Sequence, residues 1–424
     1  MKKLKNYVKL AGVLAGVITI SLTRIGVTYA SSLGVEVEHN QGERLKLKYS
    51  EWYRNDEIVY PINIFDDEWN KLETNEEMVE ITKVPDELLE GLSTAELLKL
   101  VEDYPLLGNI YCYGLSLDGL HKLADECDAL GEFLERDDSL DIAMKRYEEL
   151  KINCPDRPDL EKLETDEAMT EYVNKVLDND DLLKRDMDES GSARLCELLE
   201  LLMVDMTDAE KLGEIVEMVD DKLDEKAECV FYNYESTSTF VSVLSDDMEC
   251  VQNNARIGVA RSGTQKTITY NGIKIVVSED RGGTPIGIAN VETIMAPYKD
   301  NDEVELIAVG LDSYNCHSYA WLKDKYPSDF RWYWLNSVPS ELMKKYYYKS
   351  SEPKSAGTIA YTAQHSAVIV DPNNTKLDHG KLIKDPIVRA KWGSGPIVKS
   401  PMSEGLYAMS SQDVEAYYTI IHKK

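Results

Sequence analysis

The chain has 424 residues, of which 43% are hydrophobic and 29% are charged, and its formal net charge is −30 at pH 7. A chain of this length is expected to form two or three domains with cores of their own. The negative charge argues against nucleic acid as a partner, because proteins bind nucleic acids largely by neutralising phosphates with basic side chains.

The first 30 residues have the organisation of a secretory signal peptide. Four lysines precede an apolar run over residues 10–22, and Thr28-Tyr29-Ala30 has the small-x-small pattern of a cleavage site. The run is too short to span a bilayer as a permanent anchor, and no later stretch is long enough to be transmembrane. We therefore expect a secreted, extracellular protein, either free or associated with the cell wall, and not an integral membrane protein.

Residues 31–227 are predicted to form an acidic, mainly helical (all-α) domain. They carry 54 acidic and 21 basic side chains, a net charge of −33, whereas residues 228–424 carry 23 and 21, a net charge of −2. Apolar residues recur at helical spacing over 169–177 and 212–223, and the pairs Ser93/Glu96 and Thr207/Glu210 have the spacing of capping boxes. A solvated surface explains the charge; attraction to cationic surfaces or weak binding of divalent cations are the alternatives.

Residues 228–300 are predicted to be a β-rich extension. Two runs of β-branched residues within 267–277 are separated by Asn271-Gly272, which is a strong hairpin signal, and a further run covers 240–244. This part either packs on the domain that follows or contributes to a substrate-positioning surface. Cys229 and Cys250 flank a segment that a disulfide would close, whereas Cys127 and Cys196 lie on apolar helical stripes and are expected in the core.

Cys316 is the first candidate functional residue. It lies in the segment Tyr-Asn-Cys-His-Ser-Tyr-Ala-Trp at 314–321, where Ser313 and Asn315 are suited to cap a short helix that begins at the cysteine. The dipole and the free N–H groups of a helix N-terminus favour an anion, so the pKa of the thiol is expected to fall below its usual value of about 8.5.

His365 is the second candidate, 49 residues after Cys316 and directly before an apolar strand. A thiol becomes a good nucleophile when an imidazole takes its proton, so the pair predicts Cys316 as nucleophile, with its own N–H as an oxyanion donor, and His365 as general base and acid. His317 is a poor base because adjacent residues do not face each other on a helix. The alternative is that both residues are structural. No spacing of four zinc ligands occurs, so neither a metal nor a cofactor is predicted.

These motifs resemble a known group of proteins. Residues 293–417, with the cysteine segment, His365-Ser366-Ala367 and Lys391-Trp392-Gly393, are similar to secreted Firmicutes proteins of the papain-like amidase clan of NlpC-like and CHAP domains. The resemblance implies a papain-like α+β domain with an antiparallel sheet and the activity of a cysteine amidase or peptidase. Residues 84–147 resemble a helical module of secreted Firmicutes proteins that has no assigned function.

The third residue of a catalytic triad is not evident. Thr358 and Ala390 stand where relatives commonly carry Asp and Ser, and the polar candidates after the histidine strand are Asp378 and His379. Of these two residues, His379 is predicted to be the third catalytic residue.

The substrate cleft is expected to be lined by residues beside the two motifs, namely Tyr314, Asn315, Trp392 and Gly393. Aromatic side chains are also frequent between Cys316 and His365, at 330, 332–334 and 346–348. They belong either to the core or to a surface that stacks on sugars or lines an acyl pocket.

The predicted fold class is α+β. A signal peptide (1–30) is followed by an acidic helical domain (31–227), a β-rich extension (228–300) and a papain-like cysteine hydrolase-like domain (301–424). The predicted function is that of a secreted cysteine amidase or peptidase that acts on cell-wall peptides or related amides, with a peptide or peptidoglycan-like substrate. The alternative is a non-catalytic binding or adaptor module of the cell surface with an amidase-like fold.

Overall fold

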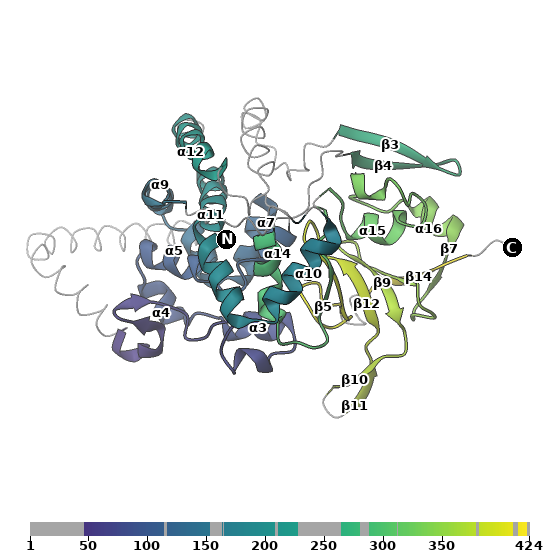
Figure 1. The fold of residues 1–424 in the computed structure, drawn as a ribbon, viewed down its shortest axis with the longest axis horizontal. Coiled ribbons are helices and arrows are strands. Elements are labelled where there is room, and N and C mark those ends of the chain that lie inside the picture. Colours follow the sequence, from purple (N-terminus) through teal and green to yellow (C-terminus); the bar gives the residue numbers. More distant parts are fainter. Residues whose placement is uncertain are drawn as a thin grey trace, which may run out of the picture. The chain divides into compact units, whose positions relative to one another are not determined.

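A computed structural model describes residues 46–113, 117–152, 163, 165–207, 211–227, 264–279, 288–311, 313–378, 381–409 and 414–421. These residues form a mixed α+β structure, as the sequence predicts at this level (Figure 1). The signal peptide, the strand predicted at 240–244, Cys229, Cys250 and His379 lie outside the described residues. The chain divides into two compact units, Met1–Pro61 with Pro85–Ser93, and Ile62–Val84 with Thr94–Lys424.

The smaller unit is built around a two-stranded hairpin. Its elements are η1 (Ser50–Trp52), β1 (Tyr53–Arg54), β2 (Glu57–Ile58) and α4 (Asp86–Gly91). Asn55 and Asp56 both have positive φ, as a two-residue hairpin turn of type I′ requires. The Trp52 and Tyr60 rings lie 5.5 Å apart. Lys48 forms an ion pair with Glu87 of α4, which ties the helix to the segment that precedes the hairpin.

The first group of helices in the larger unit is formed by the acidic part of the sequence. They are η2 (Trp69–Lys71), α3 (Asn75–Ile81), α5 (Thr94–Glu102), α6 (Asn109–Cys112), α7 (Leu117–Glu126), α8 (Asp128–Leu134), α9 (Ser139–Glu149), α10 (Asp166–Leu177), α11 (Asp180–Met206) and α12 (Leu212–Ala227). The two predicted stripes are confirmed, since Val173 and Val176 of α10 and Ile215 and Val219 of α12 are buried. Cys127 and Cys196 are buried, as expected for core residues.

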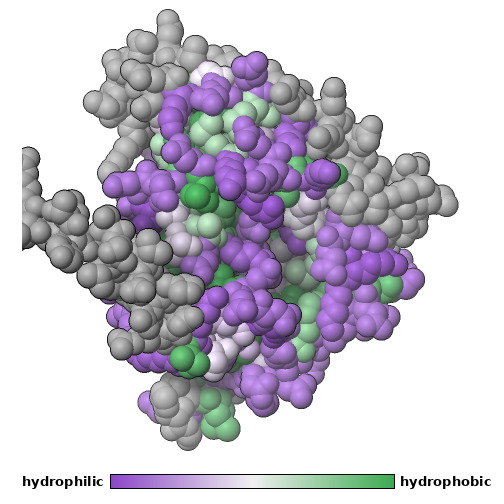
Figure 2. Space-filling model, turned by 90° about the vertical axis from the view of Figure 1, so that its left-hand side faces the viewer, coloured by the Kyte–Doolittle hydropathy of each residue, from purple (hydrophilic) through white to green (hydrophobic). Residues whose placement is uncertain are grey.

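One face of the molecule can be described by the hydropathy of its residues. One face carries mainly hydrophilic side chains, with apolar residues visible between them (Figure 2). On the helices of the larger unit, part of the acidic charge is paired, as in Arg146 with Glu102 and Lys83 with Asp128. Among the described residues, no helix combines the length and the apolar character needed to cross a membrane.

A seven-stranded antiparallel sheet follows the helices in sequence. Its strand order is β5 (Glu305–Ala308), β13 (Ile397–Pro401), β12 (Ile387–Lys391), β9 (Ser366–Asp371), β8 (Ile359–Tyr361), β14 (Ala416–Ile420) and β7 (Tyr347–Ser350). Every neighbouring pair in this order is antiparallel. The predicted antiparallel sheet is therefore present in the described part of residues 301–424.

Smaller elements flank this sheet. A three-stranded sheet joins β3 (Thr264–Tyr270), β4 (Ile273–Glu279) and β6 (Tyr333–Trp334), and β10 (Thr375–Asp378) pairs with β11 (Lys381–Lys384). The β3–β4 hairpin turns at Asn271 and Gly272, both with positive φ, so the Asn-Gly signal is confirmed. The remaining elements are α14 (Ile288–Met295), η6 (Ala296–Tyr298), α15 (Cys316–Leu322), η7 (Phe330–Trp332) and α16 (Ser340–Tyr346).

The aromatic residues between Cys316 and His365 contribute mainly to a core beneath α15. Phe330, Tyr333 and Tyr347 belong to one buried cluster with Trp321, whose ring contacts the rings of Tyr347, Tyr361 and Tyr418. Tyr348 is exposed. Of the two predicted roles for these aromatic residues, packing in the core is therefore the one that applies to Phe330, Tyr333 and Tyr347.

The helices and the sheet of the larger unit pack against each other. In Figure 1, α14 lies beside α10 and α11, and α10 also packs on β5. Asp166 of α10 accepts a hydrogen bond from the Gly310 N–H at 3.2 Å, and the Trp69 indole donates to the Pro297 carbonyl at 2.9 Å. The domain boundary predicted near residue 227 thus separates two parts of the chain that share a packed interior.

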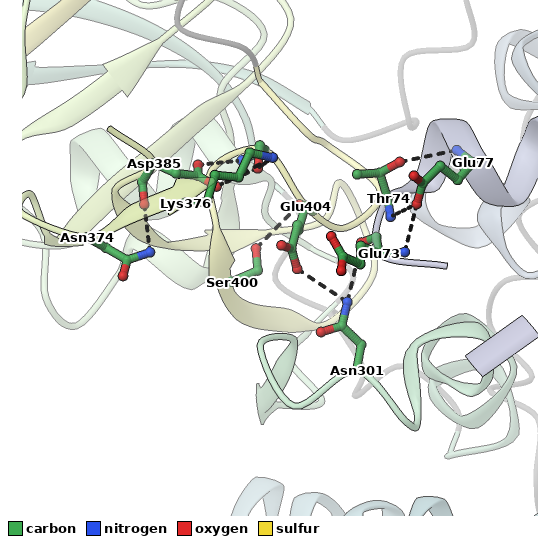
Figure 3. A network of polar contacts seen from close by, with 10 residues as sticks. Glu73, Thr74, Glu77, Asn301, Asn374, Lys376, Asp385, Ser400 and Glu404 are labelled. Atoms are coloured by element: carbon green, nitrogen blue, oxygen red, sulfur yellow. Dashed lines mark hydrogen bonds and ion pairs between the residues drawn. The ribbon is translucent and has the colours of Figure 1, made fainter. Parts of the chain in front are cut away.

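A polar network joins the start of α3 to the loop after β13 (Figure 3). The Asn301 amide donates to the Glu404 carboxyl group at 3.3 Å and to the Glu73 carbonyl at 3.4 Å. Glu404 is buried and hydrogen-bonds the carboxyl group of Glu303. Burial, the bond to Glu303 and the nearby Asp385 raise the pKa of Glu404 to about 8. Glu404 is therefore mostly protonated at neutral pH.

Replacement of Glu404 tests this protonation. The folded-state pKa of about 8 lies above the ordinary value of 4.5, so the folded state holds the proton more tightly and stability falls as pH rises between these values. Glu404→Gln is expected to flatten this dependence and to raise the free energy of unfolding at neutral pH by roughly 1 kcal/mol, after allowance for solvent screening. Urea unfolding across this pH range measures both effects. Glu305→Gln, at an exposed carboxylate paired with Lys399, is the control; an unchanged pH dependence in Glu404→Gln contradicts the prediction.

Candidate functional site

Cys316 is the first residue of α15, as the sequence predicts. The side chain of Asn315 caps this helix by accepting a hydrogen bond from the Ser318 N–H at 3.0 Å, and its amide donates to the Leu335 carbonyl at 3.0 Å. The second bond anchors the cap to the chain beyond the helix. Asn315 therefore fixes where α15 begins and the direction in which the Cys316 side chain leaves it.

The thiol of Cys316 lies at the start of β9. Helix α15 packs on β9 and β12, and the thiol accepts hydrogen bonds from the backbone N–H groups of His317 and Ser366. Ser366 is the first residue of β9 and directly follows His365. The fold therefore brings together two parts of the chain that are 49 residues apart in the sequence.

His365 occupies the turn between β8 and β9. Its backbone is fixed on both sides, because its N–H donates to the Thr362 hydroxyl at 2.8 Å and its carbonyl accepts from the Thr362 N–H at 2.9 Å. The imidazole stacks on the Tyr407 ring, with centroids 4.4 Å apart and planes at 1°. The side chain is 3% exposed, and in the described structure its Nδ1 has no hydrogen-bond partner. Such an unpaired buried nitrogen costs about 1–3 kcal/mol.

The ring of His317 is engaged elsewhere. Its Nδ1 lies 2.7 Å from the Ser366 hydroxyl, which also accepts from the Trp321 indole N–H at 2.9 Å, and its other nitrogen donates to the Ala363 carbonyl. This network assigns the proton to Nε2 and makes the Ser366 hydroxyl the donor to Nδ1. His317 thus ties α15 to the β8–β9 turn, in agreement with its rejection as the base.

Lys391 is a component of the site that the sequence analysis named only as part of a motif. It ends β12 and is fully buried. Its Nζ donates to the Gly395 carbonyl at 2.5 Å and to the Gly393 carbonyl at 3.2 Å, and it lies 4.8 Å from the centre of the Tyr314 ring. Its positive charge lowers the pKa of the Cys316 thiol. A lysine is rarely fully buried, so only the tertiary structure reveals this role.

The residues expected to line a cleft lie mostly inside the protein. Tyr314 is buried against Phe330, Trp392 is buried against Tyr298, and Asn315 is the buried helix cap. Gly393 is half-buried in the turn after β12. These residues therefore surround the base of the site in this structure and do not form an exposed wall. The position of His379 is outside the described residues.

Helix α6 covers the site. A Cβ on Gly393, whose φ is +56°, would lie 1.7 Å from the Cys112 carbonyl oxygen, and one on Gly395 would lie 2.7 Å from the Cys112 sulfur. The Tyr407 hydroxyl donates to the same Cys112 carbonyl at 3.2 Å, while its ring covers His365. Cys316 is consequently only 5% exposed. Glycine is required in this turn because the main chain of α6 approaches so closely.

This closure determines the protonation of the candidate pair. Burial raises the pKa of the Cys316 thiol to about 11, although the backbone N–H groups of Ser366, His317 and Cys316 and the charge of Lys391 act in the opposite direction. Burial, with a smaller effect of His317, lowers the pKa of His365 to about 3. The lowered thiol pKa expected from the helix N-terminus is wrong for this closed arrangement, because desolvation outweighs the helix contribution. At neutral pH both groups are uncharged.

The described residues contain no group of three or more His, Cys, Asp and Glu side chains arranged to hold a metal ion. Comparison with known proteins does not add an assignment, since no protein-family model, no curated protein and no solved structure matches the chain. The contacts and charges of the site are therefore the basis for its function.

Cysteine alkylation tests the cover over the site. If α6 and the turn after β12 separate, Cys112 and Cys316 become accessible in the same opening event, whereas Cys127 and Cys196 stay inside the helical packing. We expect Cys112 and Cys316 to react with iodoacetamide together, at least about tenfold faster than the other two when each rate is divided by its rate in denaturant. Peptide mass mapping over time measures the four rates. Reaction of Cys316 while Cys112 stays protected contradicts this cover.

Proposed function

We propose that the chain is a secreted cysteine amidase or peptidase and that residues 301–424 form its papain-like hydrolase domain. The observation that carries the proposal is the unpartnered, buried Nδ1 of His365, one residue away from the Ser366 N–H that meets the Cys316 thiol. An imidazole nitrogen that has no partner, next in the chain to the residue whose N–H meets the thiol, is available for proton transfer. A cysteine helix packed on an antiparallel sheet supports the papain-like assignment.

The proposed reaction uses two residues. The imidazole of His365 takes the proton of the Cys316 thiol, and the thiolate sulfur attacks the carbonyl carbon of an amide. The N–H groups at the start of α15 stabilise the oxyanion. His365 then gives its proton to the leaving amine, which leaves a thioester on Cys316. Water, deprotonated by the same imidazole, hydrolyses the thioester and regenerates the thiol.

Substrate access requires the cover to move. Cys316 and His365 are both buried beneath α6 and Tyr407, so an amide reaches the sulfur only after the Cys112–Gly393 contact opens. Opening also admits water or the polar backbone of a peptide, which removes part of the desolvation that keeps both groups neutral. The closed structure is accordingly the resting form of the proposed enzyme.

The proposed substrate class follows from the expectation that the protein is exported from the cell. A signal peptide over residues 1–30 would place the enzyme outside the cell, where peptide cross-links of the cell wall are amides within reach. The acidic surface would keep such a protein soluble there. We propose peptide or peptidoglycan-like amides as substrates on this basis.

A non-catalytic binding module is the second candidate. It is favoured by the uncharged state of the thiol and imidazole in the closed site. It is also favoured by the lack of an evident third catalytic residue, since Thr358 and Ala390 stand where relatives commonly carry Asp and Ser. A binding module with this fold would adhere to wall peptides without cleaving them.

Two substitutions separate these candidates. Cys316→Ser and His365→Gln are each expected to lower kcat/KM for wall-derived peptides by on the order of a thousandfold, and the double variant should lose no more, because both residues serve one step. Cys196→Ser, which alters a buried thiol in α11, should leave activity unchanged. Mass spectrometry of muropeptide products measures the rates. His379→Ala reports whether a third residue contributes.

The outcomes lead in different directions. Full activity in Cys316→Ser excludes this residue as the nucleophile. Binding of wall peptides without turnover, equal in the wild type and in both variants, favours the adaptor module.

A further inference from the structure

Lys391 is fully buried at the site, which makes it an unusual lysine. An ammonium group taken out of water costs several kcal/mol unless hydrogen bonds and nearby charges compensate. Two hydrogen bonds from its Nζ, to the Gly393 and Gly395 carbonyl groups, supply part of this compensation.

The contacts of Lys391 converge on the chain around Cys316. Its Nζ holds two carbonyl groups of the turn after β12, those of Gly393 and Gly395, and lies over the ring of Tyr314, two residues before the cysteine. The ammonium thus joins the turn that α6 covers to the segment that leads into α15. Displacement of the Lys391 side chain would remove its contacts with both the turn and this segment.

The register of the sheet places Lys391 level with the candidate pair. Arg389 of β12 lies opposite Val368 of β9 as the last pair of this register, and continuing the register by two residues would bring Lys391 opposite Ser366. Opposite residues in such a pair project to the same face. The Ser366 hydroxyl contacts His317 and Trp321 of α15. Lys391 therefore projects toward the helix that carries the thiol, from the strand beside the one that His365 precedes.

We propose that Lys391 is the positioning residue of the Cys316 site, supplying a fixed positive charge that favours the thiolate. This inference rests on the proposed function in naming Cys316 the nucleophile. It assigns charge stabilisation to the lysine and proton transfer to His365.

Other ionisable groups surround the Cys316 thiol and also bear on the equilibrium between thiol and thiolate. They are Cys112 of α6, Glu126 of α7, His317 of α15, His365 of the β8–β9 turn, Tyr314 before α15 and Tyr407 of the loop after β13. Lys391 lowers the pKa of both the Cys112 and the Cys316 thiols, whereas Glu126 raises that of Cys112. Burial prevails over the lysine in the closed site. Lys391, Tyr314 and Cys316 all belong to elements other than α6, so movement of α6 leaves the contact between the lysine and Tyr314 in place.

The test removes the charge and keeps the volume. In Lys391→Met the pKa of Cys316 should rise enough to lower its thiolate fraction about tenfold at an alkaline pH, which corresponds to one pKa unit. The thiolate is measured by its ultraviolet absorbance, as the difference between each protein and the same protein with Cys316→Ser. Lys399→Met, which removes an exposed lysine from the neighbouring strand β13, is the matched control and should leave the titration unchanged.

Two further variants separate charge from structure. Lys391→Gln keeps a donor for the turn carbonyls without the charge, and Lys391→Arg keeps the charge. A raised Cys316 pKa in Lys391→Gln, together with a wild-type value in Lys391→Arg, supports the proposal. A Cys316 titration unchanged in a folded Met or Gln variant overturns it. Because the titration uses no substrate, a protein that shows the shift but cleaves no amide refutes the hydrolase and leaves the charge assignment intact.

Discussion

The close approach of the Cys112 main chain to the turn at Gly393–Gly395 sets the state of the whole site. It leaves no space for a side chain at Gly393. It also provides the carbonyl that anchors Tyr407, and the Tyr407 ring then covers His365. Water is thereby kept from both the sulfur and the imidazole. Burial favours the uncharged form of both groups, and His317 adds to this effect at His365.

Two opposing effects then act on the Cys316 sulfur. Desolvation favours the thiol, while the N–H groups of His317 and Ser366 and the charge of Lys391 favour the thiolate. The first effect is reduced in part when the cover opens, whereas the others are built into α15, β9 and β12. In such a site, movement of α6 away from the turn after β12 changes the reactivity of the thiol. The groups that perform the chemistry do not rearrange.

Local signals in the sequence predicted local structure well. Asn315 specified the start of α15, and Asn271-Gly272 specified the β3–β4 hairpin, because a helix cap and a two-residue turn depend on residues only a few positions apart. The partnership of Lys391 with Tyr314 and the approach of Cys112 to Gly393 were not foreseen. These contacts link residues 77 and 281 positions apart, counted as 391 − 314 and 393 − 112, and no periodicity reports them. The domain boundary at residue 227 stays a prediction, although hydrogen bonds such as that from the Gly310 N–H to Asp166 join the two sides.

The proposed division of work between Lys391 and His365 has a consequence for the chemistry. In a thiolate–imidazolium pair the histidine provides both the counter-charge and the proton acceptor, and a third residue with an acceptor atom orients its protonated ring. A lysine that provides the counter-charge removes the need for a standing imidazolium. His365 can then remain neutral between steps and be oriented by stacking on Tyr407, a contact that requires no proton on Nδ1. The lack of an evident third catalytic residue is then compatible with catalysis, because the ring is charged only during the transfer itself.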